Sequence, residues 1–143
     1  MATNPELLVL AASAQAFLTI VVLLVLGARR RAAYKAGKVG REAMLDDRVW
    51  PSHVLQASNN YKNQFEVPVL FFAAVATALA IQAATVMFVW LAWGFVAART
   101  VHSVSHCGSN KLPVRFTGFL ASVIAVTIMW AMLAAHVFST GTI

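Results

Sequence analysis

The chain alternates between long uncharged stretches and short segments that carry nearly all of its charge. Three uncharged runs stand out, at residues 7–28, 67–98 and 116–143. A transmembrane helix needs about 20 mostly apolar residues, so the first and third runs each predict one span. The first run is not typical of a signal peptide, because the acidic Glu6 precedes it and the basic residues 29–31 follow it, as after a stop-transfer segment.

The middle run, residues 67–98, is longer than one span needs and shorter than two. A basic segment, residues 29–48, precedes it, and Arg99, Lys111 and Arg115 follow it. Lysine and arginine accumulate on the cytoplasmic side of a membrane, so the chain should cross an even number of times between these clusters. The run therefore predicts a helical hairpin turning near Gln82. This gives four spans, with both termini on the non-cytoplasmic side.

Composition agrees with a membrane protein. Of the 143 residues, 60% are hydrophobic and 11% are charged, whereas soluble domains carry about 25% charged residues. The net charge of +6 lies between apolar blocks and not on a solvated face, which argues against nucleic-acid binding. We expect one all-α domain over residues 1–143, an integral membrane four-helix bundle. Its predicted helices cover about residues 6–36, 55–82, 84–107 and 113–139.

The two helices of the hairpin must extend into polar sequence, because two spans need about 40 residues. With the turn at residue 83 and a rise of 1.5 Å per residue, Glu66 and Arg99 lie roughly 25 Å and roughly 24 Å from the turn. Both therefore lie at one depth, near the cytoplasmic boundary. Two polar helix faces should meet there: Asn59, Asn63 and Glu66 at spacing i, i+4, i+7, and Arg99, His102 and His106 at i, i+3, i+7.

The flanking prolines and glycine refine this picture. Pro68 closely follows Glu66 and removes one backbone hydrogen bond, so a kink is expected there. The third helix should end at residues 108–110, a cluster of helix breakers. Pro113 suits the start of the last helix, which would place Arg115 in its first turn at the same membrane level.

These groups combine two arginines and two histidines with a single carboxylate. Ionisable side chains at this depth usually face the bundle interior or a cavity. The excess of positive charge predicts an anionic ligand, such as a carboxylate or a thiolate. One alternative is a structural salt bridge of Glu66 with Arg99 or Arg115. A metal site on His102, His106 and Glu66 is disfavoured, because the two arginines would repel a divalent cation, and no metal is expected.

Two segments also resemble a known family. Asn63-Gln64-Phe65-Glu66-Val67-Pro68 looks like an Asn-x-x-Glu-x-x-Pro region on the second helix, with Pro68 one place earlier than in some members. Arg99-Thr100-Val101-His102, then His106, then Pro113-Val114-Arg115 looks like the Arg-x-x-His element and the Pro-x-Arg opening of the fourth helix. The family is that of the membrane-associated proteins in eicosanoid and glutathione metabolism (MAPEG), which includes microsomal glutathione transferases and prostaglandin E synthase.

The resemblance implies a homotrimer that binds glutathione, as co-substrate, between neighbouring subunits at the cytoplasmic edge. Arg115 would be the catalytic residue and would stabilise the thiolate. A hydrophobic electrophile would arrive from the surrounding membrane lipids. The glutathione-binding residues carried over from the family, together with His106 at the position of a family tyrosine, are Lys62, Asn63, Glu66, Arg99, His102 and His106.

The expected function is thus that of a membrane-embedded glutathione transferase or peroxidase. Three positions depart from the family pattern: His106 stands in place of the family tyrosine, and Phe116 and Phe119 stand where the prostaglandin synthase branch carries Ser and Tyr. Their lack of hydroxyl donors argues against prostaglandin-type isomerisation. The alternative is a non-catalytic membrane protein of the same fold that binds lipid or a protein partner. In a bacterium, the expected location is the inner membrane.

Overall fold

The computed structural model describes residues 5–141, and every regular element in that range is helical. Five α-helices are joined by short connections, with two short 3₁₀ helices, η1 and η2, after the first of them. The elements are α1 (Pro5–Lys35), η1 (Arg41–Met44), η2 (Asp47–Val49), α2 (Ser52–Asn63), α3 (Val67–Ala80), α4 (Val86–Cys107) and α5 (Leu112–Thr140).

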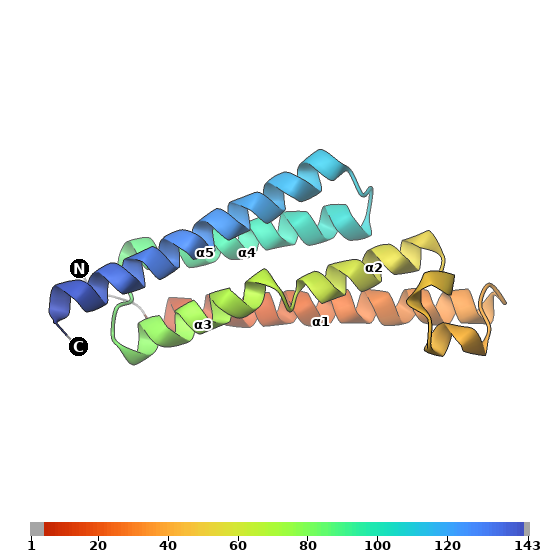
Figure 1. Cartoon of the computed structure of the whole chain (residues 1–143), viewed down its shortest axis with the longest axis horizontal. Coiled ribbons are helices and arrows are strands. Elements are labelled where there is room, and N and C mark those ends of the chain that lie inside the picture. The colour runs from red at the N-terminus through yellow and green to blue at the C-terminus, as the bar shows by residue number, and fades with distance from the viewer. Residues whose placement is uncertain (1–4, 142–143) are drawn as a thin grey trace.

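Four segments are long and apolar enough to cross a membrane. Helices α2 and α3 together form one of them, and α1, α4 and α5 form one each. The predicted number of spans is therefore confirmed for the described residues. The hairpin turn also lies where expected, because α3 ends at Ala80 and Gln82 adopts a left-handed conformation with φ 54°. Figure 1 shows both chain ends at one end of the bundle, opposite η1 and η2, as an even number of crossings requires.

The helix expected at residues 55–82 is not continuous. It is divided into α2 and α3, which follow one another along α1 (Figure 1). Pro68 has no N–H to donate to the carbonyl of Gln64, and its ring crowds that carbonyl, so the helix cannot run unbroken through this turn. The expected kink is a full interruption at residues 64–66.

Apolar side chains form the main core of the bundle. The rings of Phe71 on α3 and Phe95 on α4 are stacked, with centroids 4.3 Å apart and planes at 1°. Most of the outer surface is also apolar: Phe17, Leu24 and Trp90 are 65%, 65% and 74% exposed. In water such a surface would be a large unpaired hydrophobic patch, and it suits contact with lipid chains.

α4 and α5 approach one another closely at Gly118. A Cβ atom added there would lie 2.9 Å from the carbonyl oxygen of Ala98 and 3.0 Å from the amide nitrogen of His102. Both obstacles are backbone atoms of α4 and cannot rotate away. Small residues at helix contacts allow such approach in membrane proteins.

We therefore expect Gly118→Ala to separate α4 from α5 and to lower the free energy of unfolding by about 1–3 kcal/mol. The matched control is Gly94→Ala, because Gly94 also lies within a helix but a Cβ there meets nothing within 4 Å. The control should be neutral or slightly stabilising, since alanine favours helix over glycine. Thermal unfolding in detergent measures both, and equal midpoints for the two variants would contradict the proposed close contact.

Candidate functional site

A groove of about 450 Å³ opens between α2, α4 and α5, near the loop that joins α4 to α5. It brings together the polar faces that the sequence predicts, from residues far apart in the chain. One wall is polar and the other is apolar. The lining residues are Asn59, Asn63, Glu66, His102, His106, Leu112, Arg115, Phe116 and Phe119.

His102 connects the three helices that form the groove. Its Nδ1 lies 2.9 Å from the backbone carbonyl of Arg115, and its Nε2 lies 3.5 Å from Nδ2 of Asn63. A carbonyl only accepts hydrogen bonds, so Nδ1 carries the proton and donates. Nε2 of the neutral ring is then free to accept from the Asn63 amide. This tautomer ties the first turn of α5 to the end of α2.

Arg115 lies in the first turn of α5, half-buried at the groove. Its Nη1 donates to Oδ1 of Asn110 at 2.9 Å, and none of the ion pairs found within residues 5–141 involves it. The guanidinium is thus positioned by a neutral amide and not by a carboxylate. The nearby N-terminus of α5 contributes a positive potential of the same sign.

Glu66 lies at the exposed rim of the groove, in the break between α2 and α3. In the described part of the chain, the three ion pairs join Arg30 to Asp47, Arg48 to Asp46 and Lys62 to Asp47. The alternative salt bridge of Glu66 with Arg99 or Arg115 is therefore not formed. Its carboxylate is left facing the groove.

His106 adds a second imidazole, edge-on to His102 with ring centroids 5.4 Å apart. Its Nδ1 is buried and has no hydrogen-bond partner among the described residues. A ligand in the groove could satisfy that atom. Across residues 5–141, no three histidine, cysteine or acidic side chains gather closely enough to hold a metal ion.

Arg99 does not line the groove, although the sequence places it on the same helix face as the two histidines. Its side chain is fully buried, and Nη2 donates to the backbone carbonyl of Asn63 at 2.7 Å. Asn63 ends α2, where helix carbonyls lack intrahelical partners. Arg99 therefore braces the helix break from behind the groove. Its Nε and Nη1 have no partner within the described range.

Lys62 also lies outside the groove lining. Its ammonium is 2.9 Å from Oδ2 of Asp47, and its side chain is 61% exposed. The family resemblance implies a role for Lys62 in binding glutathione. In this structure its ammonium pairs with Asp47, in the connection between α1 and α2.

A network of buried amide side chains lies beside the groove, and the sequence analysis does not predict it. Gln15 on α1 donates from Nε2 to Oε1 of Gln64 at 3.0 Å. Gln64 donates in turn to the carbonyl of Asn60 at 3.2 Å and to Oγ of Ser103 at 3.1 Å. Two signals could have found it: a lone glutamine in the first apolar run, and the i, i+4 spacing of Asn60 and Gln64. The network fixes the end of α2 against α1 and α4.

Comparison with known proteins gives one match. The sequence model of the MAPEG family matches residues 8–135, which includes every residue of the groove. Comparison with curated proteins and with solved structures returned no match. The match spans all four membrane-crossing segments and the groove between them, so the chain belongs to the MAPEG family, as an integral, multi-pass membrane protein.

Proposed function

We propose that this protein is a membrane-embedded glutathione transferase or peroxidase that binds glutathione in the groove between α2, α4 and α5. The observation that carries the proposal is the convergence of Asn63, Glu66, His102, His106 and Arg115 on one groove. These side chains offer amide, imidazole, carboxylate and guanidinium groups to a small zwitterionic peptide. Family membership adds the association with glutathione.

Arg115 has the catalytic role in this proposal. A free thiol has a pKa of about 8.5, so little of it is ionised at neutral pH. A guanidinium beside the sulfur favours the thiolate and lowers that pKa. In the transferase reaction the sulfur forms a bond to an electrophilic carbon, and a leaving group departs with its electron pair. In the peroxidase reaction two glutathione molecules become one disulfide, while a hydroperoxide becomes an alcohol and water.

The other groups hold the peptide and admit the second substrate. Glu66 accepts from the glutathione ammonium, and Nδ1 of His106 bonds to a polar group of the ligand. Phe116 and Phe119 form the apolar wall, along which a hydrophobic electrophile enters from the bilayer. Arg99 acts indirectly by holding the backbone of Asn63. For Lys62 to bind a glutathione carboxylate, its ion pair with Asp47 must first break.

The membrane arrangement completes the proposal. The groove lies at the cytoplasmic boundary, with both termini on the other side, as the distribution of basic residues indicates. Three copies assemble, and a neighbouring subunit closes the groove around the peptide. The buried Nδ1 of His106, which has no partner among the described residues, suits a site that gains a further partner on ligand binding.

The first test is calorimetric titration of glutathione into the detergent-purified protein and into Arg115→Leu. We expect the parent to bind glutathione saturably and Arg115→Leu not to bind it. The rate at which glutathione is conjugated to a generic aromatic electrophile should fall in the same variant. The matched control is Lys111→Leu, which removes one positive charge from the same helix end without touching the groove lining. The control should bind as the parent does.

The pH profile adds a mechanistic readout to that test. Turnover by the parent should rise with a midpoint below the ordinary thiol pKa of about 8.5, because Arg115 stabilises the anion. Any residual turnover of Arg115→Leu should rise nearer that ordinary value. Unchanged conjugation in Arg115→Leu would rule out the catalytic role, and absent binding at millimolar glutathione would leave the non-catalytic alternative in place.

A second prediction concerns Glu66 and the ligand ammonium. Glu66→Gln should weaken glutathione binding by about fivefold, the effect of one partly exposed charge pair. It should leave the binding of N-acetylglutathione unchanged, since that ligand has no ammonium to pair. The same calorimetry measures all four combinations. Equal weakening for both ligands would show that Glu66 acts on the groove as a whole and not on the ammonium.

A further inference from the structure

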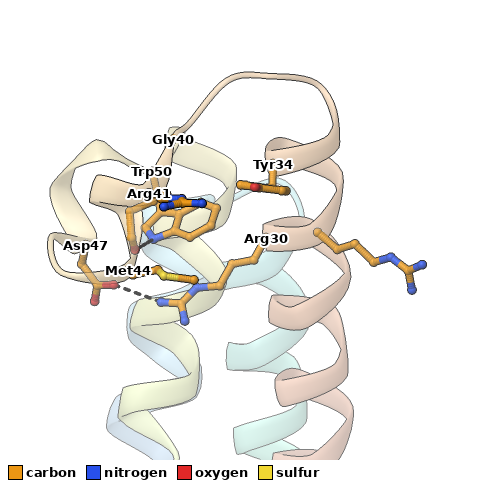
Figure 2. A pocket seen from close by; sticks show the side chains of 9 residues that line it. Arg30, Tyr34, Gly40, Arg41, Met44, Asp47 and Trp50 are labelled. Carbon is orange, nitrogen blue, oxygen red and sulfur yellow. Dashed lines mark hydrogen bonds and ion pairs between the residues drawn. The ribbon is translucent and has the colours of Figure 1, made fainter.

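The connection between α1 and α2 folds back against the end of α1 and builds a pocket there. Nε1 of Trp50 donates to the carbonyl of Ala43 at 3.1 Å, which fixes the indole. Nη2 of Arg30 lies 3.0 Å from Oδ1 of Asp47, and its guanidinium carbon lies 5.2 Å from the centroid of the Trp50 ring. Figure 2 shows Arg30 and Tyr34, from α1, pointing toward Trp50 and Arg41, from the connection.

This pocket is basic. Its volume is about 840 Å³, and its lining includes Arg30, Arg31 and Arg41 with one carboxylate, Asp47. Asp47 is already compensated by Arg30 at 3.0 Å and by Lys62 at 2.9 Å. The Lys62 hydrogen bond, with the charges of both cations, holds the pKa of the Asp47 carboxyl below its usual value despite partial desolvation.

Arg31 and Arg41 supply the excess charge. Both are exposed, and neither takes part in an ion pair found in the described range. The other two acidic residues of the connection are engaged elsewhere: the Glu42 carboxylate accepts from the backbone N–H of Gly40 at 2.8 Å, and Asp46 pairs with Arg48 at 3.0 Å. The lining therefore includes two guanidinium groups that take part in no ion pair found in the described range, together with the rings of Tyr34 and Trp50. This combination favours phosphate over a neutral ligand.

A second, mostly apolar groove lies along α1 and shares Arg31 with the pocket. Its volume is about 600 Å³, and its lining includes Leu23, Leu24, Gly27 and Ala28, with Lys35 as a second basic residue beside Arg31. A Cβ added at Gly27 would meet nothing within 4 Å, so the absence of a side chain there leaves the groove open. At the other edge of the pocket, Met44 is 86% exposed.

We propose that the basic pocket binds the phosphate of an anionic phospholipid, with one acyl chain in the groove along α1. The pocket lies at the end of a membrane-crossing helix, where headgroups are found, and the groove runs toward the apolar part of that helix. A free phosphate would use only the basic half. A phospholipid uses both halves and also accounts for the exposed Met44 and for Leu45, which is 95% exposed, as side chains that enter the lipid layer.

The test is the thermal unfolding of the delipidated, detergent-purified whole chain with added short-chain phospholipids. Phosphatidylglycerol should raise the midpoint in a saturable way, whereas phosphatidylcholine and glycerol 3-phosphate should raise it little. The variant Arg31→Gln with Arg41→Gln should weaken the apparent affinity by about fivefold for each arginine removed. Arg48→Gln is the matched control, because this exposed arginine of the same connection pairs with Asp46 and does not line the pocket.

A second variant tests the acyl-chain half. Gly27→Leu fills the groove without touching the basic pocket, and it should reduce the effect of phosphatidylglycerol while the variant itself folds normally. If phosphatidylcholine raised the unfolding midpoint as much as phosphatidylglycerol, the pocket would not select a negatively charged lipid. A full response to glycerol 3-phosphate would make this a free-anion site, and an unchanged response in the double arginine variant would overturn the assignment. Loss of glutathione binding in that double variant would assign the pocket to glutathione instead.

Discussion

The interruption of the second span at residues 64–66 determines most of what lies around it. A break in a helix frees backbone groups, and those that are buried away from water must find partners in the protein. Here the partners are long buried side chains: Arg99 donates to the carbonyl of Asn63, and Gln64 donates to the carbonyl of Asn60. The break is therefore held rigidly, and it sets Asn63 and Glu66 against α4 and α5.

The second constraint is the close approach of α4 and α5 at Gly118. Because no side chain separates the helices there, His102 on α4 can reach the carbonyl of Arg115 at 2.9 Å. That bond fixes both the imidazole tautomer and the first turn of α5. The broken span supplies one wall of the groove, and the α4–α5 contact supplies the other, so the position of Arg115 depends on both.

The sequence predicts the spans, the turn at Gln82 and the polar residues of the groove, because these follow from charge distribution and helical spacing. It does not predict which side chains of a helix face are buried in the protein and which line the groove. Arg99 and His102 share a face, yet Arg99 is drawn inward by the free carbonyl of Asn63, a contact that exists only because of the break. Lys62 lies beside Asn63 in sequence, but a carboxylate distant in the chain, Asp47, takes its ammonium.

The departures at His106, Phe116 and Phe119 give the groove a distinct chemical character. None of the described residues that line it carries a hydroxyl group, so the polar contacts available to a sulfur atom come from imidazole, amide and guanidinium groups. Under the proposed function, the rings of Phe116 and Phe119 beside Arg115 lower the local dielectric constant, which strengthens the attraction between a guanidinium and a thiolate. For that proposed ligand, a lining without hydroxyl donors is poorly suited to guide an isomerisation, yet it suits an ionised sulfur held next to an apolar substrate.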